Sequence, residues 1–305
     1  MSAFASILVQ APKLIRVPLP SSWLKPHIFS GSPSTAVGSP WEIFRPPPSL
    51  IFPPSNATDD NDTGGHTVTI ISKDGAAYGY HARISLLDEY GLGIAVLTAG
   101  DQGALAPLLD ALYARVIPAI DAAAREQAAV KYAGTFHGAA PGPGPWGNDS
   151  TVATTNASAT LAMDGHSLRL VRLSREGRDI LAALGEIWRA TAGQFLPPEM
   201  GELTGVYRLY PAEVERERTL GDGRRVVEED WRLEWGIDVS GLETDLPGRG
   251  VSDGDCRSWA LADWMHYGQQ PVDRFVFVRD AETAEVIGLE VPFLRTAVMK
   301  RVVGR

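Results

Sequence analysis

The chain has 305 residues and a mass of 32.8 kDa, which is enough for two domains of ordinary size. Apolar residues make up 44% of it and support a substantial core, whereas a net charge of −9 and a pI of about 5.2 argue against a nucleic-acid or anionic-membrane surface. The single cysteine, Cys256, excludes an intramolecular disulfide bond. We expect it to be a buried thiol.

Residues 1–65 are rich in proline and serine, which favours loop structure because proline removes backbone donors. We expect two ordered pieces here, residues 22–26 (SWLKP) and residues 38–44 (GSPWEIF). The opening segment has a brief apolar run without a cleavage pattern, so we expect neither a signal peptide nor a membrane span.

Residues 66–100 hold the most consistent local signals. Three short runs, His66–Lys73, Tyr80–Leu87 and Leu92–Thr98, have strand composition, and Asp74-Gly75 is a turn signal. The pattern predicts an antiparallel meander of three strands.

Residues 101 to about 130 have apolar side chains at three- and four-residue spacing, which predicts an amphipathic helix. Asp101 is the expected N-cap and Gly134 the expected stop. Pro118 is expected to kink or split the helix.

From about Lys131 the chain consists of short apolar runs separated by turn residues, which predicts a small antiparallel barrel or sandwich. One helix is expected within residues 177–192. The predicted fold class is α+β, with one domain over residues 1–130, of which 1–65 is largely loop, and a β-rich module over residues 131–305. The runs are ATLAM, SLRLVRL, GVYRLYP, RVVEEDWRLEW, DRFVFVRD and EVIGLEV.

Several of these segments resemble one known family. Lys73-Asp74-Gly75, followed by Gly79-Tyr80 and LLDEYGLGIAVLTAG, is similar to the lysine strand and the next two strands of serine β-lactamase-like and penicillin-binding-protein-like hydrolases, especially the class C and esterase branch. SWLKP, GSPWEIF and the later YAGTF resemble segments of fungal members that carry a lipocalin-like C-terminal module. The resemblance implies the back part of a β-lactamase-like sheet, a helix across it and the appended module. Family members are often secreted.

The family's nucleophile requires a serine and a lysine one helical turn apart. The single Ser-x-x-Lys here starts at Ser22, only 51 residues before Lys73 (73 − 22), and Pro26 ends any helix at once. No tyrosine precedes Lys73, so the family's Tyr-x-Asn motif is also missing. We therefore expect the chain to be a member or a fragment of this family and to be inactive alone.

The resemblance also implies roles on the lysine strand. Lys73 would lie beside the acyl or carboxylate end of a substrate, and the N–H of Ala76, just past Gly75, would be an oxyanion donor. Asp74 replaces the usual threonine or serine, and we expect it to neutralise Lys73 partly and to repel anionic groups. Lys73, Asp74 and Tyr78 are the candidate substrate-binding residues.

We expect a small acyl compound as the ligand, and no cofactor, metal, nucleic acid or membrane. Because the predicted sheet is partial, we also expect self-association through its exposed surface.

The alternative function is a non-catalytic binding protein in which the β-rich module holds an apolar ligand. Its basis is the group of tryptophans in the second half of the chain, although core packing explains such residues equally well. They are Trp188, Trp231, Trp235, Trp259 and Trp264.

Other polar groups suggest no separate chemistry. The six histidines lack metal-ligand spacing and are expected on the surface or in turns. Residues 228–230 (EED) with Arg224-Arg225 are expected to form a solvated hairpin, and Asp253-Gly254-Asp255 lacks the later glutamate of a calcium loop.

Overall fold

A computed structural model of the chain divides into two compact units, residues 1–126 and 127–305. Each unit is described by itself. The Asp253-Gly254-Asp255 segment, Cys256, Trp259 and Trp264 lie outside the described residues. The structure describes residues 21–52, 66–101, 103–141, 154–165, 167–191, 194, 202–237, 265–267 and 269–302.

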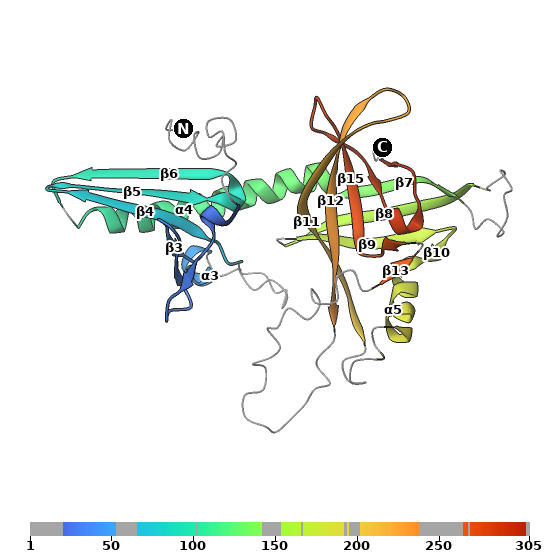
Figure 1. Ribbon diagram of the computed structural model, residues 1–305, viewed down its shortest axis with the longest axis horizontal. Helices are drawn as coiled ribbons and strands as arrows, with labels where there is room; N and C mark the ends of the chain where they lie inside the picture. Colours follow the sequence, from blue (N-terminus) through green and yellow to red (C-terminus); the bar gives the residue numbers. More distant parts are fainter. Residues whose placement is uncertain are drawn as a thin grey trace, which may run out of the picture. The chain divides into compact units, whose positions relative to one another are not determined.

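The first unit is built on a six-stranded antiparallel sheet in which the strands follow one another in chain order (Figure 1). The predicted meander forms its second half. Three short strands before it were not predicted, because each has only two or three residues and depends on its neighbours for pairing. The strands are β1 (Ile28–Phe29), β2 (Thr35–Val37), β3 (Glu42–Phe44), β4 (Ile70–Ala77), β5 (Tyr80–Leu87) and β6 (Leu92–Ala99).

The turn predicted at Asp74-Gly75 is wrong. Both residues lie inside β4, where Asp74 pairs with Arg83 and Gly75 with Ala82. The chain reverses instead at Tyr78-Gly79, where Gly79 adopts a φ of 77°. Glycine accepts this left-handed conformation without steric cost, and cross-strand pairing overrides the Asp-Gly signal.

Helix α4 (Leu105–Tyr132) is the predicted helix, and it continues through Pro118 as one element. It begins after Asp101, whose carboxylate accepts a hydrogen bond from the N–H of Gly103 at 2.8 Å. Within the first unit, its buried stripe packs on one face of the sheet, against Val68, Ile70 and Leu87. The stripe is Leu109, Tyr113, Ile117 and Asp121, at four-residue spacing. The described residues of this unit also form three short helical turns: η1 (Ser21–Leu24), α3 (Pro48–Ile51) and η2 (Asp88–Tyr90).

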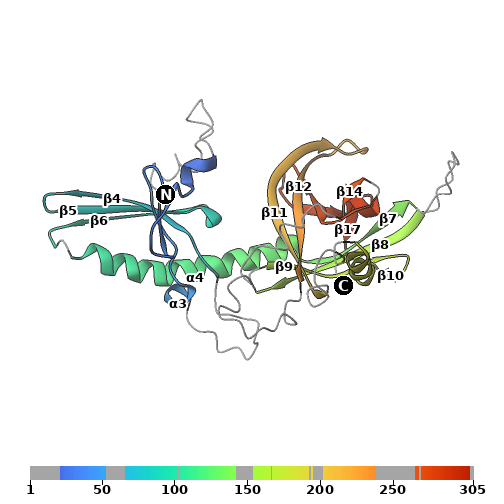
Figure 2. The ribbon, with the colours of Figure 1, turned by 60° about the horizontal axis from the view of Figure 1, so that its bottom comes forward.

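The second unit is a closed eight-stranded antiparallel barrel (Figure 2). Its strand order is β9-β11-β12-β15-β16-β17-β7-β8, and pairing of β8 with β9 closes the ring. Closure removes exposed strand edges. The strands are β7 (Gly134–Pro141), β8 (Thr154–Asp164), β9 (Ser167–Arg175), β11 (Leu203–Thr219), β12 (Arg225–Ile237), β15 (Arg274–Asp280), β16 (Val286–Glu290) and β17 (Met299–Arg301).

Short elements surround the barrel. Helix α5 (Ile180–Ala190) is the predicted helical interruption, and Asp179 caps it by accepting hydrogen bonds from the N–H groups of Leu181 and Ala182. The others are β10 (Arg178–Asp179), β13 (His266–Tyr267), β14 (Gln270–Pro271) and η5 (Pro292–Leu294).

Aromatic side chains fill much of the barrel core. Trp231 and Phe277 contact edge to face with ring centres 5.2 Å apart, and Trp188 contacts Trp235 at 6.1 Å. Trp188, Trp231 and Trp235 are buried, so the core-packing interpretation holds for these three tryptophans.

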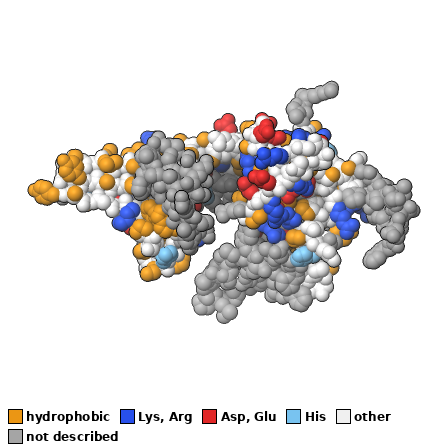
Figure 3. All heavy atoms as spheres, turned by 45° about the horizontal axis from the view of Figure 1, so that its top comes forward, with side chains coloured by type: hydrophobic (Ala, Val, Ile, Leu, Met, Phe, Trp, Pro, Cys, Tyr) orange, Lys and Arg blue, Asp and Glu red, His pale blue; other side chains and the backbone are white. Residues whose placement is uncertain are grey.

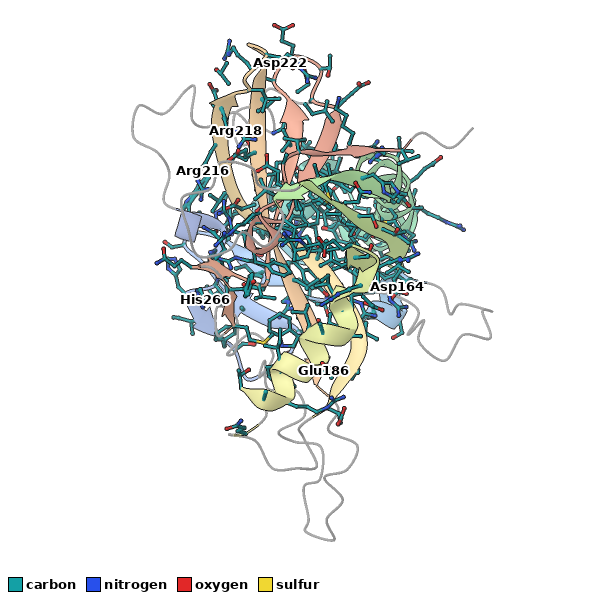
Figure 4. All side chains as sticks on the ribbon, turned by 90° about the vertical axis from the view of Figure 1, so that its right-hand side faces the viewer. Asp164, Glu186, Arg216, Arg218, Asp222 and His266 are labelled. Carbon is teal, nitrogen blue, oxygen red and sulfur yellow. The ribbon has the colours of Figure 1, made fainter. Side chains whose placement is uncertain are left out.

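The predicted hairpin forms from β11 and β12, with Arg224 and Arg225 exposed at its turn, but the expectation that residues 228–230 are solvated is wrong. These residues lie in the middle of β12, between β11 and β15, and their side chains are only 11–13% exposed. Arginines from the flanking strands pair with the carboxylates on the outer face of the barrel, where acidic and basic side chains are interspersed (Figure 3). Two of these arginines, Arg216 and Arg218, project from β11 (Figure 4). The pairs are Arg218 with Glu228, and Arg216 and Arg274 with Asp230.

No helix among the described residues is both long and apolar enough to cross a membrane.

Candidate functional site

The second half of β4 is an open strand edge. Strand β3 pairs only with Ile70, Ile71 and Ser72, so in the described part of the chain no strand pairs with Lys73–Ala77 on the side away from β5. Lys73, Asp74, Gly75 and Ala76 follow one another along this edge. An open edge presents backbone N–H and C=O groups to a ligand.

Lys73 is paired with a residue that sequence analysis did not single out. Its Nζ lies 2.6 Å from Oε1 of Glu42 on β3, and both side chains are about half exposed. Glu42 belongs to the GSPWEIF segment, so this segment brings a carboxylate to the start of the open edge. The ammonium group is thus positioned by an ion pair that solvent screens.

Asp74 interacts with a different partner. Side chains alternate along a strand, so Asp74 and Lys73 project from opposite faces of the sheet. The carboxylate of Asp74 accepts hydrogen bonds from Nη2 of Arg83, at 2.5 Å, and from Nε of the same residue. These bonds hold the pKa of Asp74 below its usual value. Arg83 is thus the hydrogen-bonding partner of Asp74, and the charge of Lys73 also lowers the pKa of Asp74.

The backbone of Ala76 faces the open edge. A two-residue hairpin closes with a hydrogen-bonded pair, here Ala77 and Tyr80, and hydrogen-bonded and non-hydrogen-bonded pairs alternate from there. Ala76 and His81 form the next pair, so the N–H of Ala76 points away from β5. A Cβ built on Gly75 would meet no atom within 4 Å, which leaves space above the strand.

Tyr78 lies at the tip of the hairpin and is 99% exposed. Its ring therefore has no contact that fixes it toward the edge formed by Lys73–Ala77.

The Ser-x-x-Lys at residue 22 does not form a helical pair. Helix η1 ends at Leu24, so Lys25 lies beyond it. Trp23 packs edge to face on Trp41, with ring centres 5.2 Å apart, and joins a core cluster with Ile43. This segment stabilises the sheet by packing.

A partly buried polar cluster in the first unit was missed by sequence analysis. The hydroxyl of Tyr90 donates a hydrogen bond to Oδ1 of Asp121 at 3.0 Å and lies 3.0 Å from Nε2 of His66. Nε of Arg125 lies 3.0 Å from Oδ2 of Asp121. The cluster links α4 to the η2 turn and to the segment before β4. The one available signal was Asp121 within the apolar stripe of α4.

The expectation that every histidine lies on the surface or in a turn is therefore wrong for His66. Its ring is mostly buried and packs on Phe52, with centres 5.3 Å apart. Burial lowers the pKa of His66, and burial also raises the pKa of Tyr90. Among the described residues, no group of three or more histidine, cysteine or acidic side chains is arranged to hold a metal ion.

Comparison with known proteins assigns the chain to a family. The family model described as "Beta-lactamase-like-like, C-terminal domain" matches residues 124–302, which is more than half of the chain. The chain belongs to this family.

Fungal proteins of the same kind are similar over most of the chain. A "Beta-lactamase-like protein" of Arthroderma benhamiae is 32% identical over 92% of this chain and 44% of its own length. "Probable hydrolase clz13" of Cochliobolus lunatus is 25% identical over 88% of the chain and 38% of its own length. "Probable hydrolase M10" of a Phoma species is 26% identical over 88% of the chain and 39% of its own length.

The chain thus spans less than half of the length of these curated β-lactamase-like relatives. No solved structure gives a significant match. The resemblance inferred from Lys73-Asp74-Gly75, SWLKP, GSPWEIF and YAGTF is confirmed at the level of the family.

Proposed function

We propose that this chain is the C-terminal part of a serine acyl hydrolase and that the edge formed by Lys73–Ala77 is one wall of its acyl-binding site. The observation that carries the proposal is the open half of β4, where a cation and an outward-facing backbone N–H follow one another. The hydrolase names of two relatives support the reaction class. The substrate class is an ester, amide or lactam.

Each group at the edge has a chemical part in this proposal. The N–H of Ala76 would donate a hydrogen bond to the oxyanion of a tetrahedral intermediate, a contact that strengthens as charge develops. Lys73 would attract the developing negative charge, and Glu42 would keep its ammonium group oriented. Because Asp74 is bound by Arg83 on the other face, its repulsion of an anionic substrate group is reduced.

The chain alone lacks a nucleophile in this proposal, since Lys25 lies beyond the end of η1. The purified 305-residue chain should not hydrolyse a chromogenic ester or a chromogenic cephalosporin. Turnover that Ser22→Ala abolishes would contradict the proposal, because it would make the serine of SWLKP the nucleophile.

A complementation experiment tests whether the edge formed by Lys73–Ala77 takes part in hydrolysis. The part of the Arthroderma benhamiae relative outside the matched 44% is coexpressed with this chain. Hydrolysis should appear, Lys73→Ala should lower it by about tenfold to a thousandfold, as loss of one electrostatic group does, and Lys25→Ala should leave it unchanged. An active complex that is indifferent to Lys73→Ala would refute the role of this edge.

We also propose that the chain associates with a second copy through β6. This strand ends the sheet, and in the described residues nothing pairs beyond it. Its sequence LGIAVLTA has neither a charge nor a proline to block edge pairing, and Leu97 is 78% exposed. An antiparallel pairing of two β6 strands centred on Val96 would set Leu97 opposite Ala95, a large side chain against a small one.

A further inference from the structure

The barrel wall is interrupted between β9 and β11. These strands pair at only two positions, Leu168 with Leu209 and Arg169 with Arg208. Beyond Leu209, β11 carries Pro211 and a register shift between Pro211 and Val214. The pairing of β9 with β11 stops here because β9 begins at Ser167, which would lie opposite Tyr210. Pro211, the next residue of β11, has no N–H to donate to a ladder.

A cavity of about 140 Å³ lies at this interruption, beside the last turn of α4. All of its walls belong to the second unit. Most of the lining is apolar or aromatic. The lining residues are Ala128, Tyr132, Met163, Ser167, Leu168, Leu209, Tyr210, Pro211 and Trp231.

The hydroxyl-bearing residues of the lining already have partners. The hydroxyl of Tyr132 donates a hydrogen bond to Glu229 at 2.8 Å, and Oγ of Ser167 accepts one from Nε of Arg208 at 2.9 Å. Tyr210 also has a partner. A ligand in the cavity would therefore gain little from polar groups of its own, and a charged ligand would lose its hydration without compensation.

Two aromatic walls set the shape of the cavity. The rings of Tyr132 and Trp231 lie 4.8 Å apart at an angle of 56°, and Trp231 is held by its edge-to-face contact with Phe277. Aromatic pairs prefer such tilted contacts, and a third ring placed against them gains the same attraction.

We propose that this cavity binds a small uncharged apolar group, of the size of a benzene ring. An apolar protein cavity of about 150 Å³ is known to bind benzene, so a volume of about 140 Å³ matches one ring and little more. The site belongs to the barrel and is separate from the acyl-hydrolase proposal, because it uses no residue of the edge formed by Lys73–Ala77.

Benzene and benzoate, titrated into the full 305-residue chain, test the proposal. Benzene should give a saturable change in tryptophan fluorescence and a rise in Tm, with a Kd on the order of 1 mM for so small a ligand. Benzoate should bind at least about tenfold more weakly, because its charge has no partner in the cavity.

A matched pair of helix variants locates the binding. Ala128→Leu fills the cavity with added carbon atoms and should abolish the benzene response. Ala122→Leu makes the same change at an exposed position of α4 and should leave the response intact. Leucine has nearly the helix propensity of alanine, so both variants should keep the helix.

A crystal of the unaltered chain under xenon pressure provides a test that needs no substitution. Xenon should lie in the cavity, against the rings of Tyr132 and Trp231. The proposal is overturned if benzene gives no saturable response, if Ala128→Leu binds benzene as the parent chain does, or if xenon is absent from this cavity.

Discussion

Glu229 is the residue whose removal best tests how the barrel is held together. It projects from β12 on the same face as Trp231, toward the core, and its side chain is 12% exposed. Its carboxylate accepts a hydrogen bond from the hydroxyl of Tyr132 at 2.8 Å, lies 2.5 Å from Nε of Arg279 and lies 3.5 Å from Nζ of Lys131. Burial and this hydrogen bond raise the pKa of Tyr132.

The expected cost of Glu229→Ala follows from these contacts. Removing one partner of a buried ion pair costs about 3–5 kcal/mol, because the other charge stays buried without compensation. Arg279 retains Glu215 at 3.0 Å, so we expect the lower end, about 3 kcal/mol. Tyr132→Phe removes only a hydrogen bond to a charged group and should cost about 1.5 kcal/mol.

The measurement is urea unfolding of the full chain, followed by near-ultraviolet circular dichroism and by amide hydrogen exchange of β12 and β15. Exchange assigns the loss of stability to the barrel, since the other unit can unfold separately. Glu215→Ala is the matched control, because Glu215 contacts the same arginine but is 60% exposed. It should cost less than about 1 kcal/mol. Equal losses for Glu229→Ala and Glu215→Ala would refute the reasoning.

Three further outcomes are expected. Gly138→Ala should destabilise the barrel by about 1–3 kcal/mol in urea unfolding, because its Cβ would lie 2.8 Å from backbone of β17, whereas Gly185→Ala, with open space in α5, should be neutral or stabilising. In sedimentation velocity, Leu97→Lys should shift the chain toward monomer and Leu50→Lys, at another exposed leucine, should not; unchanged association of Leu97→Lys would contradict pairing through β6. The pKa of His66 is lowered in the folded chain, so the unfolded chain takes up a proton at this residue more readily. The stability contributed by the neutral ring of His66 is therefore complete above pH 6.5 and is lost as pH falls through the lower folded pKa. Between pH 7 and pH 5 the parent chain should thus lose more stability than His66→Gln. Identical profiles of unfolding free energy against pH for the two chains would contradict this prediction.

Local pattern predicted most of the elements. Apolar spacing indicated α4, α5 and the long strands of the barrel, because burial of one face imposes a period on the sequence. Local signals failed where pairing partners decided the outcome: Asp74-Gly75 continues a strand because β5 pairs with it residue for residue. Pro118 is tolerated inside α4, where the predicted split does not occur.

In the candidate sites, too, single residues could be recognised from the sequence, whereas their partners required the structure. Lys73 and its strand were recognisable from consecutive residues, but its partner Glu42 lies 31 residues earlier and required the β3–β4 pairing to be known. The cluster of His66, Tyr90 and Asp121 unites three separate segments, and no spacing rule connects them.

The amino-acid sequence by itself determined the family, the order of the longer helices and strands and the position of the lysine strand, since these depend on residue types and on short-range periodicity. The tertiary structure alone decided which edge of β4 is open, that the acidic run of β12 is buried among arginines, and that a ring-sized cavity remains beside α4. These features arise from contacts between distant segments, because burial and strand pairing are properties of the assembled sheet and not of any one strand.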